Sequence, residues 1–132
     1  MIAIDTNIFV RSIMQDEPIQ SAKASAFLGS LTGENRGYLT LVTLAELFWV
    51  LDRRYKLPRH RTLNVIHSLL AKNGLTIENE LAVVDALTSY QTNTAADFSD
   101  CLISRCAIIA GCDSTYTFDK GAARSAGMTL LA

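Results

Sequence analysis

A regular alternation of short apolar runs with longer segments of helical spacing is the feature that most constrains the fold. Five short runs read as strands and are bounded by polar or turn-forming residues: 1–4, 38–42, 75–77, 115–118 and 128–131. Between them, apolar residues recur every three or four positions. This alternation predicts an α/β fold in which a mainly parallel central sheet is covered by helices.

The helical spacing predicts helices over residues 8–14, 19–31, 43–54, 62–72, 78–90, 96–110 and 120–126. The helix over 43–54 has the clearest pattern and is expected to stop at Pro58, and Gly74 is expected to cap the next helix. In the helix over 78–90, Leu81, Val84 and Leu87, together with Ala82 and Ala86, are expected on the inner face. Because no repeat, charge block or linker divides the chain, residues 1–132 are expected to form a single domain.

Charge and cysteine content exclude several classes of protein. The 132 residues include 12 Lys and Arg against 13 Asp and Glu, so a polyanion must be met by a local patch or through bound metal. Three cysteines without C-x-x-C spacing favour reduced thiols in a cytoplasmic protein. No signal peptide and no apolar run of ~18 residues is found, so no membrane association is expected.

Acidic residues recur where the expected elements begin or end. Asp5 follows the first strand and Asp119 a later one, and open parallel sheets bind ligands at the carboxyl ends of their strands. Turns and N-caps explain each Asp separately. Asp97 and Asp100 project from one side of a helix start, where the helix dipole favours each acid, but like charges repel and a divalent cation relieves the repulsion.

Glu46 has two explanations that the sequence leaves open. Thr43 and Glu46 have the spacing of a capping box, in which the Glu bonds back to the helix start. Glu46 also lies inside the apolar stretch 39–51, where a carboxylate costs free energy unless it is paired or bound to a metal. Both roles are compatible, because a helix N-terminus orients such a side chain.

Four segments together resemble the motifs of PIN domains, and specifically of toxins of the VapC type. In chain order they are Ile2-Ala3-Ile4-Asp5-Thr6-Asn7, Thr43-Leu44-Ala45-Glu46-Leu47, Asp97-Phe98-Ser99-Asp100-Cys101-Leu102-Ile103 and Thr117-Phe118-Asp119-Lys120. Each motif is weak alone, but four in the right order cover nearly the whole chain. The resemblance implies a Rossmann-like α/β/α sandwich and cleavage of RNA that depends on Mg²⁺ or Mn²⁺.

The resemblance also assigns roles to individual acids. By position, Asp5, Glu46 and Asp100 match the three core acids of the family, Asp119 matches a more variable fourth, and Asp97 matches an extra acid of this subgroup. The first four would be catalytic, and all five would hold the metal. The chain departs from the pattern at Ser104-Arg105, where many members carry small residues.

The chemistry of these residues agrees with that assignment. Carboxylate oxygens select Mg²⁺ or Mn²⁺ over Zn²⁺, and His60 and His67 lie away from the acids in the sequence. A metal pair ~3.5–4 Å apart could activate water and stabilise the leaving oxygen of a phosphodiester. Thr6, Asn7 and Thr117 could orient the ligands, although turn chemistry explains them nearly as well.

Cationic and aromatic residues are candidates for contact with RNA or a partner. The cations are Arg53, Arg54, Lys56, Arg59, Lys120 and Arg124. A solvated helix end explains the first four equally well. Trp49 falls off the main apolar stripe of its helix and could anchor an interface. The resemblance further implies a cognate antitoxin and a homodimer.

Several functions therefore remain open. The leading hypothesis is a metal-dependent endoribonuclease that cleaves single-stranded RNA as the toxin of a toxin–antitoxin pair. The second is a PIN-type RNA-processing nuclease without an antitoxin. The third is a non-catalytic regulatory module with an acidic pocket, such as a phospho-receiver, although a receiver would place paired acids after the first strand, where Asp5 stands alone until Asp16-Glu17. A non-catalytic PIN scaffold is disfavoured because all four acids are kept.

Overall fold

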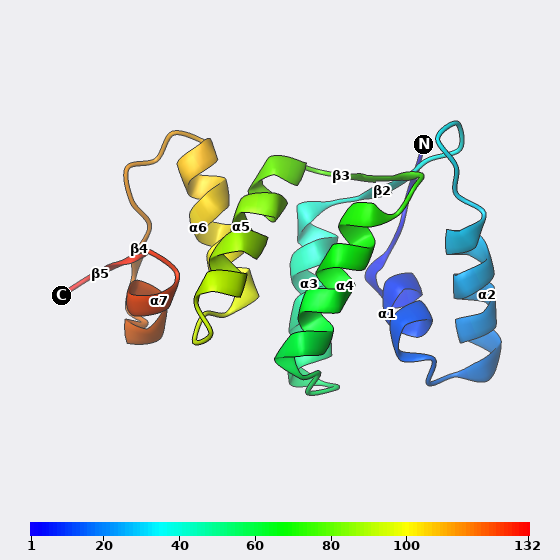
Figure 1. Ribbon diagram of the computed structural model, residues 1–132, viewed down its shortest axis with the longest axis horizontal. Helices are drawn as coiled ribbons and strands as arrows, with labels where there is room; N and C mark the ends of the chain where they lie inside the picture. Colours follow the sequence, from blue (N-terminus) through cyan, green and yellow to red (C-terminus); the bar gives the residue numbers. More distant parts are fainter. The chain divides into compact units, whose positions relative to one another are not determined.

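The computed structural model describes residues 1–132, which divide into two compact units, Met1–Glu78 and Asn79–Ala132. Each unit has its own parallel strands and its own helices (Figure 1). No helix is both long enough and apolar enough to span a membrane. The expectation of one domain for the whole chain stays a prediction.

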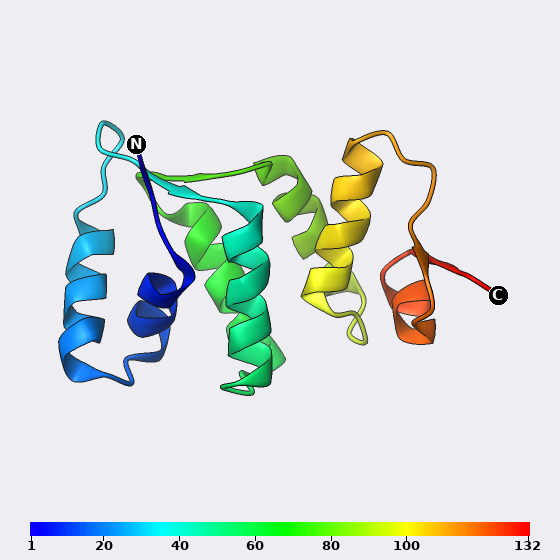
Figure 2. The ribbon, with the colours of Figure 1, turned by 180° about the vertical axis from the view of Figure 1, so that it is seen from behind.

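The first unit is built on a three-stranded parallel sheet. Its strands are β1 (Ile2–Ala3), β2 (Gly37–Leu39) and β3 (Leu75–Ile77), in the order β1-β2-β3. Helices α1 (Thr6–Met14) and α2 (Pro18–Gly29) connect β1 to β2, and helices α3 (Leu41–Arg53) and α4 (Arg59–Ala71) connect β2 to β3 (Figure 2). Parallel strands need such crossover helices, so the prediction of an α/β fold with parallel strands is confirmed.

The core of the first unit comes from the apolar stripes of its helices and from β2. Phe9, Leu39, Leu44, Leu47 and Leu51 are at most 1% exposed. Helix α1 packs against both α2 and α3, and α4 contacts β3. Burial of each large side chain contributes about 1.5–3 kcal/mol, so these contacts set the positions of the helix ends that carry the acidic motifs.

Several boundaries in the first unit differ from the prediction. Leu41 and Val42 were expected in a strand but begin α3, because the hydroxyl of Thr40 caps that helix. Pro58 was expected to stop α3, which already ends at Arg53; Pro58 is instead the N-cap residue of α4, where its missing N–H costs nothing. Gly74 lies beyond the C-cap of α4 and leads into β3.

The second unit pairs two helices with a small sheet. It contains α5 (Glu80–Thr92), α6 (Phe98–Ile109), β4 (Tyr116–Thr117), α7 (Lys120–Ser125) and β5 (Thr129–Leu130). Helices α5 and α6 pack along their length, and the rings of Tyr90 and Phe98 meet edge to face with centroids 5.6 Å apart. Strands β4 and β5 are parallel, and α7, which connects them, packs against both.

The inner face of α5 is partly the predicted one: Ala82, Ala86 and Leu87 are buried as expected, but Leu81 and Val84 are not. Leu81 and Val84 are 62% and 42% exposed. The buried residues are Ala82, Val83, Ala86, Leu87 and Tyr90. Their spacing of i, i+1, i+4, i+5 and i+8 is also helical, and packing selected this stripe because its alanines allow close approach.

All three cysteines are free, as their spacing predicted. Cys101 is fully buried on α6, and burial raises the pKa of its thiol. A protonated, inaccessible thiol is inert, so Cys101 acts as a small apolar core residue.

Candidate active site

Asp5 stands at the point where β1 gives way to α1. It is the N-cap residue of α1, with an extended backbone, but its side chain makes no capping hydrogen bond. The residue is exposed. Because the carboxylate is not used by the helix start, it is free to bind a cation, and the N-cap explanation accounts for its backbone alone.

Thr6 connects this motif to the second one. Its hydroxyl, in a side chain that is 6% exposed, donates a hydrogen bond to Oε1 of Glu46 on α3. The hydroxyl of Thr6 bonds to one carboxylate oxygen of Glu46, and this hydrogen bond does not involve the other oxygen, Oε2. This contact supports the predicted orienting role of Thr6, and it joins the first turn of α1, directly after Asp5, to the second turn of α3, which carries Glu46.

Glu46 is not part of a capping box. Helix α3 begins at Leu41, and the hydroxyl of Thr40 accepts a hydrogen bond from the N–H of Thr43 at 3.1 Å. Glu46 therefore lies in the second turn of α3, where it cannot reach the helix start. It is exposed, so the expected cost of burying a carboxylate in an apolar stretch does not arise.

The N-terminus of α3 is also bound by Glu78, which the sequence predicts in a later helix. Oε1 of Glu78 accepts a hydrogen bond from the N–H of Leu41 at 2.8 Å. Glu78 was expected to begin the following helix, but it directly follows β3. No local pattern reveals this role, because the two residues are 37 positions apart in the chain.

In the second unit, two acids cap helices with their side chains. Asp97 begins α6 and accepts a hydrogen bond from the N–H of Ser99 at 2.8 Å. Asp119 begins α7 and accepts one from the N–H of Gly121 at 2.7 Å. The hydroxyl of Thr117 accepts a hydrogen bond from the N–H of Asp119 at 3.0 Å, so Thr117 steadies the turn that carries Asp119.

Three acids meet at one pocket of the second unit. Asp97, Asp100 and Asp119 line a pocket of about 170 Å³, and the rest of its lining consists of Ala95, Gly121, Ala122, Ser125 and Ala126. No cationic side chain is among these residues. The small side chains leave room beside the carboxylates, so the pocket suits a small hydrated cation.

The charges in this pocket also favour the binding of a cation. Burial raises the pKa of Asp100, and the negative charges of Asp97 and Asp119 raise it further. Ionisation of Asp100 is therefore less favourable in the folded protein than in the unfolded chain. A divalent cation would reverse that effect, because it attracts all three carboxylates.

The donor set fits a hard divalent cation, since every candidate ligand is a carboxylate oxygen. Within neither unit does a group of three or more His, Cys, Asp or Glu side chains have the spacing of a ready-made metal site. The structure thus divides the five predicted acids between the two units: Asp5 and Glu46 are linked through Thr6 in the first, and Asp97, Asp100 and Asp119 line one pocket in the second. That the two groups share one cation stays a prediction.

Comparison with protein families matches the PIN-domain model to residues 2–128. The chain belongs to the PIN-domain family. This match runs through all four predicted motifs, and it confirms the resemblance at the level of the family. PIN domains are generally nucleases and typically use divalent metals, so membership supports a nuclease, and hence hydrolase, role for this PIN domain. Comparison with curated proteins returned no match.

The predicted cationic contacts fall into two places. Arg53 and Arg54 end α3, Lys56 lies in the following turn and Arg59 begins α4. Arg53 lies 3.7 Å from a carboxylate oxygen of Asp52, an exposed pair. Lys120 and Arg124 are exposed on α7, the helix that Asp119 caps. Trp49 is 60% exposed, in agreement with its position off the apolar stripe.

Proposed function

We propose that this PIN domain is a metal-dependent endoribonuclease that cleaves single-stranded RNA with a water molecule as the attacking group. The observation that carries the proposal is the pocket at which Asp97, Asp100 and Asp119 meet with no cation among the lining residues. Such a pocket repels a phosphodiester unless a divalent cation neutralises it. Family membership supports the nuclease activity, and the hard oxygen donors support Mg²⁺ or Mn²⁺.

The proposed mechanism divides the work among the acids. Asp100, Asp119, Asp5 and Glu46 would hold the cation, with Asp97 as an additional ligand, and the bound cation would activate water and stabilise the leaving oxygen. A carboxylate oxygen of this set would accept the proton of the attacking water. Thr6 keeps Glu46 oriented through its hydrogen bond. Hydrolysis of this kind leaves a 5′-phosphate and a 3′-hydroxyl.

A cleavage assay on an end-labelled single-stranded RNA tests the activity. We expect cleavage with Mg²⁺ or Mn²⁺, none with EDTA, and a loss of about 10²–10⁴-fold in Asp5→Asn and in Asp100→Asn. Asp113→Asn is the matched control, because Asp113 is an exposed acid outside the four motifs. Full activity in Asp5→Asn would mean that Asp5 serves only as the N-cap residue of α1. Products that carry a 2′,3′-cyclic phosphate would exclude water as the attacking group.

The cationic residues are proposed to guide the RNA backbone. Lys120 and Arg124 are carried by the helix that begins at Asp119, and the cluster Arg53, Arg54, Lys56 and Arg59 spans the turn between α3 and α4. Replacement of Arg53, Arg54 and Arg59 by Ala is expected to weaken RNA binding and to flatten its salt dependence. An unchanged salt slope would leave these residues as a solvated helix end.

We further propose that the nuclease is the toxin of a VapC-type pair and forms a homodimer. The support is the exposed apolar face of α3 beside Glu46, on which Val42 and Trp49 are 81% and 60% exposed. Co-expression with the product of the neighbouring gene should restore growth and give a complex without ribonuclease activity. A chain that is harmless alone and binds no such product would favour the RNA-processing nuclease instead.

A further inference from the structure

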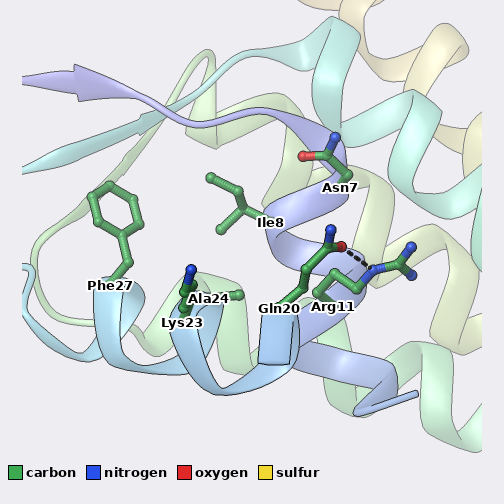
Figure 3. A pocket seen from close by; sticks show the side chains of 7 residues that line it. All are labelled: Asn7, Ile8, Arg11, Gln20, Lys23, Ala24 and Phe27. Atoms are coloured by element: carbon green, nitrogen blue, oxygen red, sulfur yellow. Dashed lines mark hydrogen bonds between the residues drawn. The ribbon is translucent and has the colours of Figure 1, made fainter. Parts of the chain in front are cut away.

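The first unit contains a pocket of about 330 Å³ between α1 and α2. Figure 3 shows its side chains: Asn7, Ile8 and Arg11 come from α1, and Gln20, Lys23 and Phe27 come from α2. The lining therefore combines two cations, two amides and apolar side chains. No carboxylate lines it. Apart from Asn7, which ends the first acidic motif, the lining residues belong to none of the four motifs.

The charge of the pocket favours an anionic ligand. Lys23 is exposed and has no ion-pair or hydrogen-bond partner. Arg11 is held in place, because its Nε donates to Oε1 of Gln20 at 2.8 Å and its Nη1 lies 3.3 Å from Oδ1 of Asp16. Asp16 offsets part of the Arg11 charge, so Lys23 is the cation that remains available. A phosphate is the anion for which such a cation and a neighbouring guanidinium are suited.

The apolar and amide side chains suit a nucleobase. Ile8 and Phe27 are half-buried on opposite helices of the pocket, and an aromatic ring offers a stacking surface to any base. The amide of Asn7 carries a donor and an acceptor, and the amide nitrogen of Gln20 adds a donor, since Oε1 of Gln20 accepts from Arg11; these groups match the mixed donors and acceptors on the edge of an unpaired base. The pocket thus offers partners for a base and its phosphate together.

We propose that this pocket is a nucleotide subsite, which holds one unpaired base of the RNA substrate together with its phosphate. The proposal rests on the nuclease function proposed above. Asn7 lies two residues after Asp5, so the first turn of α1 carries an acid of the candidate site and a wall of the pocket. Arg11 follows Asn7 by one helical turn, or about 6 Å along the axis. An RNA strand seated here would therefore pass beside the first turn of α1, which directly follows Asp5.

Binding of a fluorescent single-stranded RNA of about ten nucleotides, measured by anisotropy in EDTA, tests the proposal. Lys23→Gln should weaken binding about fivefold and lower the salt slope by about 0.7, the value for one phosphate contact on a single strand. Phe27→Leu should weaken binding about tenfold, because one stacked base is lost. Lys72→Gln removes the same charge at the end of α4 and should bind as the unaltered protein does.

A titration with 5′-AMP, followed by NMR, separates the possible occupants. We expect 5′-AMP to shift the signals of Lys23, Phe27 and Gln20 more than inorganic phosphate does. If the protein cleaves RNA but Lys23→Gln and Phe27→Leu bind it normally, the subsite is wrong and the nuclease function stands. Shifts caused by an amphipathic peptide and not by 5′-AMP would assign the pocket to a protein partner. A protein that neither binds nor cleaves RNA would overturn both proposals.

Discussion

Thr6 carries the hydrogen bond that links the first acidic motif to the second, and its loss should be felt in catalysis. Thr6→Val keeps the shape of the buried side chain and removes the donor to Glu46. Residues that orient a ligand in this way are worth about 10–100-fold in activity, and we expect a fall of that size in the RNA cleavage rate. Thr6→Ser retains the hydroxyl and should keep most activity. Equal rates for the Val variant and the unaltered protein would make the hydrogen bond incidental.

Asp100 should weaken the fold at neutral pH. Burial and the charges of Asp97 and Asp119 raise its pKa above the ordinary 3.8. A raised carboxyl pKa gives a stability contribution that is present below the ordinary value and is lost as the pH rises through the raised value. In the absence of metal, Asp100→Asn should therefore raise Tm at pH 7 by about 1–3 °C, with a smaller difference near the ordinary pKa. Thermal melts of both proteins at several pH values measure this, and a lower Tm for the variant at pH 7 would contradict it.

At the scale of the elements, Gly74 allows the chain before β3 to pack closely against the backbone that follows α2. Its φ is +81°, and an added Cβ would lie 2.7 Å from backbone atoms of both Leu31 and Thr32. Its carbonyl accepts the N–H of Gly37 at 2.8 Å, which aligns β2 with β3. Gly74→Ala should cost about 2–4 kcal/mol in the free energy of unfolding, from the strained backbone and the contact together.

Gly29 offers the matched control for this prediction. It ends α2, and a Cβ there would meet nothing within 4 Å. Gly29→Ala should leave stability unchanged or raise it by up to about 1 kcal/mol, because Ala is the better helix former. Urea unfolding of both variants gives the comparison. Similar losses in the two would mean that the close approach at Gly74 relaxes at little cost.

At the scale of the whole molecule, a divalent cation should stabilise the folded chain. Cation binding to the native state alone adds about 2.7 kcal/mol when the cation is a hundredfold above its Kd. Tm should therefore rise with added Mn²⁺ or Mg²⁺ and return to its original value with EDTA. The rise should be reduced in Asp100→Asn, which loses a ligand, and unaltered in Asp113→Asn. An equal rise in all three proteins would place the cation away from the acidic pocket.

The sequence by itself determined the class of fold, the approximate elements and the family. Helical and strand periodicities are local properties of the chain, and the four acidic motifs are short segments that can be compared with other proteins without a structure. The same locality explains why Asp97 and Asp119 could be expected at helix starts. Both residues do cap helices, and their capping bonds span only two or three positions.

Tertiary structure decided what the acids touch. The bond from Thr6 to Glu46 spans 40 positions and the bond from Leu41 to Glu78 spans 37, so neither leaves a local pattern in the sequence. The capping box predicted for Thr43 and Glu46 does not form, because Thr40 is the residue that caps α3. The inner face of α5 depends on the side chains packed against it. The pKa of Asp100 likewise depends on its burial and on Asp119. Hydrogen bonds, burial and Coulomb interactions all act between groups that only folding brings together.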